Sequence, residues 1–155
     1  MLFLAGGITD CPDWQSEVIR LLDPLPKQWA VLNPRREHFP IHDPSAALAQ
    51  ITWEHHALRA ARAILFWFPK QTLCPNALYE LGACSMTRRR IFVGADEDYP
   101  RRLDIEIQTK LVRPDVSTSA TTLQALAAEV LSQIDIRSGR RRPWARPARG
   151  GPSDR

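Results

Sequence analysis

The chain has 155 residues, of which 25% are charged and 44% are apolar, and its formal net charge is +4. This length predicts one domain that is large enough to close a hydrophobic core. The basic surplus lies in residues 137–155, which hold seven arginines and one acidic residue and so carry +6, leaving −2 on the rest. The charge of the main body therefore does not indicate a nucleic-acid-binding domain.

Composition also excludes several other classes of protein. The longest apolar run, Ala63 to Phe68, is far shorter than the ~20 residues of a membrane-spanning helix. The first residues lack the basic region of a signal peptide, and three cysteines without a CxxC spacing form neither a disulfide framework nor a zinc site. We therefore expect a cytoplasmic protein that binds no membrane, no metal and no cofactor.

The predicted elements begin with a short buried strand over residues 2–5, which ends in a tight turn at Gly6-Gly7. Apolar residues at helical spacing predict a helix over residues 13–22. A second strand is expected over residues 29–32, where the Asn-Pro pair that follows stops it.

The middle of the chain opens with Asp43-Pro44, a pair typical of an N-cap and a first helical position, and this helix should run to about Arg62. Residues 63–68 are apolar at odd and even positions alike, which predicts a central strand covered on both faces. Another helix is expected over residues 75–86, because a proline opens it.

The last third of the chain contains one more predicted strand, residues 90–94, and two helices. The first helix is favoured over residues 101–111 by three apolar residues at helical spacing: Leu103, Ile107 and Leu111. The second follows Thr122 and has an apolar stripe: Leu123, Leu126, Val130 and Ile134. Residues 137–155 are rich in Arg, Pro and Gly and hold almost nothing to bury, so we expect a disordered tail.

Strands that alternate with helices predict an α/β fold, a single domain over residues 1–136 with a doubly wound parallel sheet and helices on both faces. Such sheets bind their ligands at the carboxyl ends of the strands. The loops that follow the strands are therefore where we expect the chemistry.

Two glutamates near the third strand are the first candidates for that chemistry. Glu54 lies three residues after Ile51, which together with Leu58 marks the expected inward face of the helix. Glu80 lies in the second turn of the next helix. A carboxylate on an inward face is costly unless it is paired or lies at a cleft. We therefore predict that both point toward one cleft, although a solvated helix face or an arginine partner would give the same pattern.

Other candidates flank the first two strands. Gly6 and Gly7 would let a ligand approach the backbone closely, and a plain tight turn gives the same pattern. Asn33 and Arg35 end the second strand, where the arginine could bind phosphate or carboxylate or could remain a solvated loop charge. Trp14 follows the glycine turn and could stack on a base, although a tryptophan is more often part of the core.

Several of these segments occur together in a recognisable order. They are Phe3-Leu4-Ala5-Gly6-Gly7-Ile8, Asp13-Trp14-Gln15, Leu32-Asn33-Pro34-Arg35, Trp53-Glu54, Phe66-Trp67-Phe68-Pro69 and Leu78-Tyr79-Glu80-Leu81-Gly82. In combination and order, from Leu2 to about Val116, the sequence resembles the nucleoside 2-deoxyribosyltransferase-like family, in its smaller bacterial branch.

The resemblance implies a Rossmann-like fold and an oligomeric enzyme that moves a 2-deoxyribosyl group between nucleobases through a glutamyl–sugar intermediate. Glu80, in Tyr-Glu-Leu-Gly, matches the family's nucleophile. Glu54 matches the acidic residue that assists proton transfer at the leaving base, and Gly6 and Gly7 match the loop that lines the sugar pocket. The expected partners are a nucleoside or nucleotide, a nucleobase and further copies of the chain.

One segment departs from the family's pattern. Better-known members carry an aspartate that holds the sugar hydroxyl between the central strand and the nucleophile, where this chain has Cys74-Pro75-Asn76. Asn76 can hydrogen-bond a hydroxyl. Three alternatives stay open. They are hydrolysis of a nucleoside or of a nucleoside 5′-monophosphate gripped by Arg35 or Arg36, nucleotide binding without catalysis, and weak non-specific nucleic-acid contact by the arginine tail.

Overall fold

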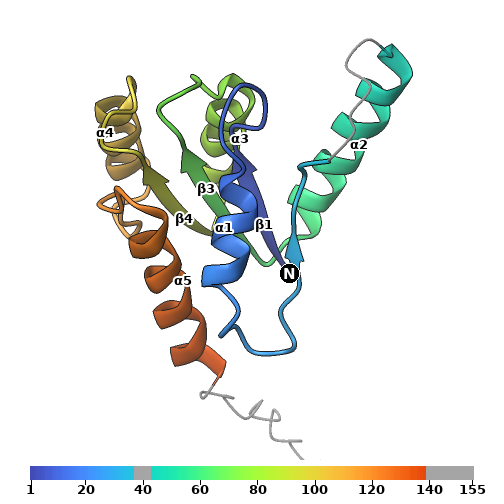
Figure 1. Cartoon of the computed structure of the whole chain (residues 1–155). Helices are drawn as coiled ribbons and strands as arrows, with labels where there is room; N and C mark the ends of the chain where they lie inside the picture. Colours follow the sequence, from blue (N-terminus) through green and yellow to red (C-terminus); the bar gives the residue numbers. More distant parts are fainter. Residues whose placement is uncertain (37–42, 139–155) are drawn as a thin grey trace, which may run out of the picture.

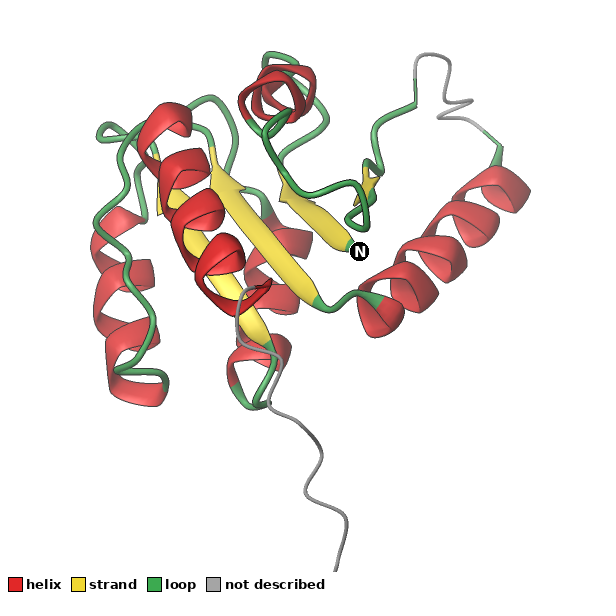
Figure 2. Cartoon of the chain, turned by 90° about the horizontal axis from the view of Figure 1, so that it is seen from below, coloured by secondary structure: helices red, strands yellow, loops and turns green. Residues whose placement is uncertain are grey.

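The computed structural model describes residues 1–36 and 43–138, and these form a single domain. Four parallel strands lie between two layers of helices (Figures 1 and 2). In sheet order the strands are β2 (Val31–Leu32), β1 (Leu2–Gly6), β3 (Ala63–Phe68) and β4 (Arg90–Ala95). The helices are α1 (Trp14–Leu21), α2 (Pro44–Ala60), α3 (Pro75–Ser85), α4 (Arg102–Val112) and α5 (Leu123–Ser138). The predicted Rossmann-like α/β fold is confirmed.

The hydrophobic core has two layers, one on each face of the sheet. All six residues of β3 are buried, as the apolar residues at both parities predicted. One parity, which includes Leu65, packs with α1 and α5, and the other, which includes Phe66, packs with α2, α3 and α4. A strand with neighbours on both sides and helices on both faces has no surface left for polar side chains.

Residues at the helix ends explain where three of the helices begin. Asp13 caps α1 by accepting a hydrogen bond from the backbone N–H of Ser16 at 3.1 Å, and Asp43 caps α2 in the same way through Ser45 at 2.9 Å. Proline stands at the first position of both α2 and α3, where no N–H is needed. These local signals are why the predicted boundaries of α2 and α3 agree closely with the structure.

Two predicted elements differ from the observed ones in instructive ways. Strand β2 has only two residues, half the predicted length, and Trp29 instead stacks with the guanidinium of Arg62 at 5.1 Å. Helix α4 forms as predicted, but its apolar stripe points outward, with Leu103 66% exposed, and Ile105 faces the core instead. Spacing predicts a helix without saying which side the sheet covers.

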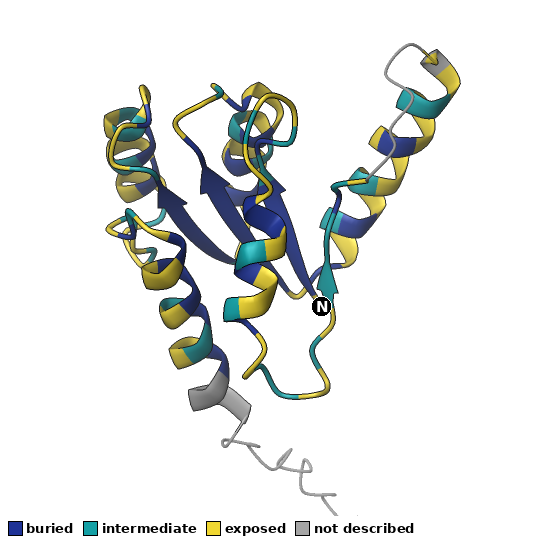
Figure 3. Ribbon diagram, viewed as in Figure 1, coloured by how far each residue is buried: buried dark blue, intermediate teal, exposed yellow. Residues whose placement is uncertain are grey.

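Helix α2 stands away from the rest of the molecule and is mostly exposed (Figure 3). Its C-terminal end packs into the core through Ala57, with Leu58 partly buried beside it. Ile51 lies on the side of α2 that faces α3, as predicted, but it is 61% exposed because an open cavity separates the two helices there. Between residues 45 and 56 the one buried residue is Gln50. The inward face of this half of α2 therefore combines polar and apolar side chains, namely Ala47, Gln50, Ile51 and Glu54.

None of the helices in the described part of the chain is both long and apolar enough to cross a membrane. Helix α5 buries the predicted stripe, which includes Leu126 and Val130, and ends at Ser138. The remainder of the segment that we expect to be a disordered tail, residues 139–155, lies outside the described residues.

Candidate active site

The strand order places a topological switch point between β1 and β3, because the chain continues from β1 outward to β2 and from β3 outward to β4. Ligands of open α/β sheets bind outside the carboxyl ends of the strands at such a point. A cavity of about 730 Å³ lies there, between α2 and α3. It is lined by Phe3, Leu4, Ala5, Gly6, Gly7, Ile8, Thr9, Asp10, Pro34, Arg36, Ala47, Gln50, Ile51, Glu54, Thr72, Cys74, Pro75, Asn76, Ala77 and Glu80.

Two walls of this cavity differ in origin. The inner wall comes from the end of β1 and the start of α3, and includes Gly6, Gly7, Cys74, Asn76 and Glu80. The outer wall comes from α2 and the loop after β2, and includes Pro34, Arg36, Ala47, Gln50 and Glu54. Five of the predicted site residues thus line one cavity: Gly6, Gly7, Glu54, Asn76 and Glu80.

The glycines of the inner wall are required by the protein's own packing. A Cβ on Gly6 would lie 2.2 Å from the carbonyl oxygen of Trp67 and 2.6 Å from the Trp14 ring. A Cβ on Gly7 would lie 2.6 Å from the side chain of Thr72. These approaches let the end of β1 lie directly against the end of β3. Contact of the two glycines with a ligand stays a prediction.

Strained backbone also gathers at this cavity. Among the described residues, the two non-glycine residues with positive φ are Asp10 at 57° and Cys74 at 49°. Both line the cavity. Aspartate tolerates this conformation, whereas cysteine adopts it rarely. Backbone strain of this kind is enriched at functional sites because surrounding packing must hold it in place.

Cys74 itself is not equipped to act as a nucleophile. Burial raises the pKa of its thiol to about 12. Its Sγ donates to the carbonyl oxygen of Thr72 at 3.4 Å. Since the thiolate is the reactive form, the thiol is inert near neutral pH.

Glu80 is the more desolvated of the two glutamates. Burial raises the pKa of its carboxyl group to about 7, and the negative charge of Glu54 adds to the shift. Helix α3 causes this burial, because it packs against β1 and β3 through neighbours of Glu80 such as Leu81. Glu80 therefore holds a proton up to about neutral pH, and a carboxyl pKa perturbed in this way is typical of functional sites.

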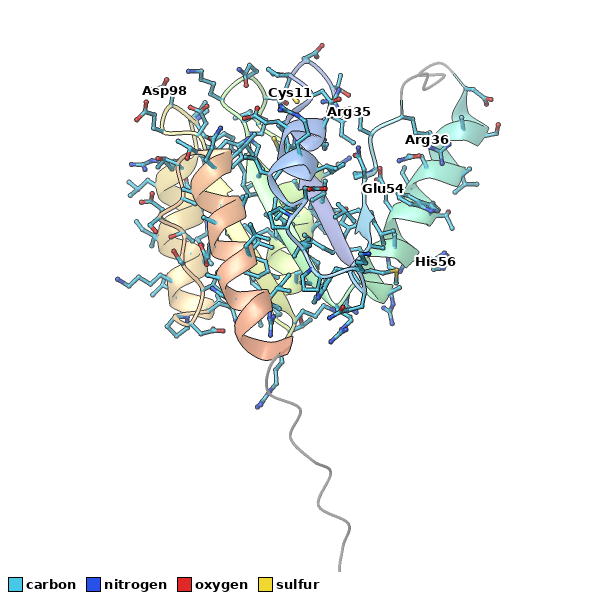
Figure 4. All side chains as sticks on the ribbon, turned by 60° about the horizontal axis from the view of Figure 1, so that its bottom comes forward. Cys11, Arg35, Arg36, Glu54, His56 and Asp98 are labelled. Atoms are coloured by element: carbon cyan, nitrogen blue, oxygen red, sulfur yellow. The ribbon has the colours of Figure 1, made fainter. Side chains whose placement is uncertain are left out.

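Glu54 faces the same cavity from α2 and is held by one neighbour. Its Oε1 accepts a hydrogen bond from Nε2 of Gln50 at 2.6 Å. The same Nε2 donates to the carbonyl oxygen of Pro34 at 3.0 Å. Figure 4 shows Glu54 with Arg36 on the α2 side of the molecule. The two glutamates thus face one cavity from different helices.

Arg35 lies beside this site but not in it. Its guanidinium donates to Oε1 of the fully buried Gln15 at 2.9 Å and to the carbonyl oxygens of Ile8 and Pro12, both at 3.1 Å. It also forms an ion pair with Asp13 at 3.3 Å. Arg35 lies next to the loop after β1, near Cys11 (Figure 4). In this structure it holds that loop in place.

Trp14 and Asn33 have similar supporting positions outside the cavity. The indole N–H of Trp14 donates to the carbonyl oxygen of Gly7 at 2.7 Å. Oδ1 of Asn33 accepts from the backbone N–H of Arg35 at 2.9 Å. A direct contact of Trp14, Asn33 or Arg35 with a ligand stays a prediction, since none of the three lines the cavity.

Sequence reasoning missed Gln50 as a site residue and gave Arg36 only as an alternative to Arg35. Gln50 lies one helical turn before Glu54, so a search for polar residues four positions from a candidate carboxylate would have found it. Nothing in the sequence separates the two adjacent arginines. No group of three or more His, Cys, Asp or Glu that could hold a metal ion occurs in residues 1–36 and 43–138.

Fold and cavity together define a class of protein, an α/β domain with two carboxyl groups facing one cavity at the switch point of its sheet. Two carboxyl groups are the usual equipment for breaking a glycosidic bond. The family described as nucleoside 2-deoxyribosyltransferase like matches residues 1–99, which include every residue that lines the cavity. The chain belongs to this family. No curated protein sequence matches the chain.

Proposed function

We propose that this protein is an enzyme that transfers a 2-deoxyribosyl group from one nucleobase to another. The proposal combines family membership with one observation, the presence of Glu54 and Glu80 on facing walls of one cavity. It assigns Glu80 as the nucleophile, Glu54 as the proton donor and acceptor, and Asn76 as a hydrogen-bond partner of the sugar.

In the first half-reaction the carboxylate of Glu80 attacks C1′ of the deoxynucleoside. A C–O bond forms to Glu80 while the C1′–N bond breaks, and its electron pair leaves with the base. Glu54 gives its proton to the departing base. The pair carries one proton, which rests on Glu80 in the free protein and must pass to Glu54 before the bond breaks. Covalent catalysis splits one difficult displacement into two easier ones.

In the second half-reaction a nitrogen of the incoming base attacks C1′ of the glycosyl ester. The C–O bond to Glu80 breaks and restores the carboxylate, while Glu54 takes the proton that the incoming base loses. Water in place of the second base would give net hydrolysis by the same steps, with the water proton passing to Glu54.

The test is incubation with a panel of 2′-deoxynucleosides, each with and without a second nucleobase, followed by mass spectrometry of the products. We expect a new deoxynucleoside only when the second base is present. Glu80→Gln should abolish this exchange while preserving the circular-dichroism spectrum. Exchange at the wild-type rate in Glu80→Gln would overturn the proposal.

The second candidate function is hydrolysis of the N-glycosidic bond of a nucleoside 5′-monophosphate. Arg36 favours it, because it lines the cavity and makes no ion pair among the described residues. A guanidinium is well suited to bind a phosphate through two parallel hydrogen bonds.

One comparison separates these candidates and the third, nucleotide binding without catalysis. If the protein hydrolyses nucleoside 5′-monophosphates, it should release free base from the 5′-monophosphate much faster than from the nucleoside. Arg36→Met should abolish this difference in rate. Tight binding by calorimetry without turnover of any panel member would instead favour a binding module.

We also propose that the chain works as a cytoplasmic homo-oligomer. Exposed apolar side chains support self-association, and they lie on α2 (Leu48, Ile51 and Trp53), on α3 (Tyr79) and on α4 (Leu103, Ile107 and Leu111). Three unpaired cysteines accord with a reducing compartment. Light scattering after size-exclusion chromatography tests the assembly, and a monomer at all concentrations would contradict it.

A further inference from the structure

Gln50 makes side-chain hydrogen bonds that its burial alone does not explain. Its Nε2 donates to two acceptors, Oε1 of Glu54 and the carbonyl oxygen of Pro34. Its carbonyl oxygen, Oε1, is buried and accepts no hydrogen bond within the described residues. Buried polar atoms nearly always have a partner, so one without a partner requires a reason.

The two acceptors fix the orientation of this amide. A flipped amide would place its carbonyl oxygen against the oxygens of Pro34 and Glu54, which are acceptors as well. The unpaired oxygen is therefore a consequence of directing the N–H groups at these two partners. A residue selected for its own burial would be apolar or fully paired.

The position of Gln50 explains why the contact matters. It is the one buried residue between positions 45 and 56 of α2, a segment that also reaches the sheet through Trp53, whose ring lies 6.4 Å from that of Phe3. The bond of Gln50 to Pro34 joins this segment of α2 to the loop after β2. Its bond to Glu54 then fixes the carboxylate relative to the same loop.

We propose that Gln50 is a positioning residue that holds Oε1 of Glu54 and leaves Oε2 of Glu54 as the oxygen that exchanges protons with the base. Oε2 accepts no hydrogen bond from the described residues. This inference rests on the proposed function for the identity of the base, while the link between Gln50 and Glu54 stands on geometry alone. A carboxylate with one oxygen fixed presents the other in one direction, and such orientation is a large part of catalytic efficiency.

Two substitutions separate positioning from simple packing. Gln50→Met keeps the length and removes the donor, whereas Gln50→Lys keeps a donor and adds a positive charge. A hydrogen bond or a positive charge stabilises the ionised carboxylate. We therefore expect the titration midpoint of Glu54 to rise in Gln50→Met and to fall in Gln50→Lys.

The measurement is a titration of the Glu54 side-chain carboxyl by carbon-13 NMR in wild type and both variants. Other charged groups that face this carboxyl group are unchanged, namely Glu80 on α3, Asp10 after β1 and Arg36 after β2. The matched controls are Gln108→Met and Gln108→Lys, since Gln108 is exposed on α4 away from the cavity. These controls should leave the midpoint at its wild-type value.

Kinetics supply the second readout. With the substrate that wild type exchanges best, Gln50→Met should lower kcat by about tenfold or more and change KM much less, because a misdirected proton donor affects the transition state. Gln108→Met should leave both constants unchanged. An unchanged kcat in a folded Gln50→Met variant would overturn the positioning role.

The NMR titration and the kinetic measurements can fail independently of each other. If wild type turns over no nucleoside, the proposed function fails, and the NMR titration still decides whether Gln50 holds Glu54. Midpoints of Glu54 that are equal in wild type and both variants overturn the inference, whatever the activity. If Gln50→Met does not fold, Gln50→Ala removes the same donor, and its Glu54 midpoint decides the matter.

Discussion

The two walls of the cavity are built in opposite ways. The inner wall is made of the strand and helix that form the core, with α3 packed against both β1 and β3. The outer wall is half of helix α2, which extends away from the sheet and is joined through Gln50 to the preceding loop, after β2. Each wall carries one glutamate, so the same residue type lies in two different environments.

This difference suits two roles. On the inner wall, burial raises the pKa of Glu80 to about 7 and packing fixes its position. On the outer wall, Glu54 remains half-buried and depends on a single amide for its orientation. These environments place the shared proton on Glu80 in the free protein, so its transfer to Glu54 would prepare Glu80 for attack and Glu54 for protonation of the base. Substitutions on each wall test this division.

The largest expected effect is on activity, and it compares a glutamate substitution on the inner wall with one on the outer wall. Glu80→Gln should lower the exchange rate by about 10³-fold or more, because no carboxylate remains to form the ester. Glu54→Gln should lower it by about 10²-fold, the usual contribution of a general acid. Rates of product formation by mass spectrometry measure both. Equal losses would indicate that the glutamates act as a unit, and a larger loss in Glu54→Gln would reverse the assigned roles.

The next effect is on the packing of the inner wall. Gly6→Ala should lower the free energy of unfolding by about 3 kcal/mol or more, because the added methyl overlaps the carbonyl oxygen of Trp67. Gly82→Ala is the matched control in α3, since its Cβ would meet nothing within 4 Å. It should stabilise the protein by about 0.5–1 kcal/mol. Urea unfolding measures both, and a neutral Gly6→Ala would show that the β1–β3 contact can relax.

Substitutions of Arg35 and Arg36 should have smaller effects, and one should change stability while the other changes ligand binding. Arg35→Met should lower the free energy of unfolding by about 2 kcal/mol, because buried acceptors such as Gln15 lose a charged donor. Arg36→Met should change it by less than about 0.5 kcal/mol, as expected for an exposed side chain. Only Arg36→Met should weaken binding of a nucleoside 5′-monophosphate relative to the nucleoside. Thermal unfolding and calorimetry check the two halves of this prediction.

The smallest effect concerns pH and stability. Glu80 has a pKa of about 7 in the folded protein and 4.5 as its ordinary value, so the folded state binds the proton more tightly. The stabilisation from this group is complete below pH 4.5 and is lost as the pH rises to about 7. The partly exposed carboxyl group should contribute about 1–2 kcal/mol to this loss.

Glu80→Gln removes this proton and its pH dependence. Melting temperatures at pH 5 and pH 8 should therefore differ less in Glu80→Gln than in wild type. An identical difference in both proteins would contradict the burial of Glu80.

Some parts of this protein follow from local sequence. Six consecutive apolar residues at 63–68 favour a strand buried on both faces, and the Asp43 cap and the prolines at the first positions of α2 and α3 mark where these helices start. The alternation of strands and helices then leads to a parallel sheet, whose carboxyl-terminal edge is the place for Glu54 and Glu80. All these signals act over a few residues, and so they can be read from the chain.

Tertiary structure decided which side each residue faces. Ile51 and Leu103 have the spacing of core residues but are exposed, because Ile51 faces the open cavity and no element of the described chain covers Leu103 on α4. Arg35 and Arg36 are neighbours in sequence, yet one holds a loop and the other lines the cavity. Gln50 is four residues before Glu54 in sequence, but its contact with Pro34, sixteen residues earlier, is set by the tertiary structure. Such contacts depend on how the helices and strands pack against one another. This packing is determined by interactions across the whole fold and not by any single segment.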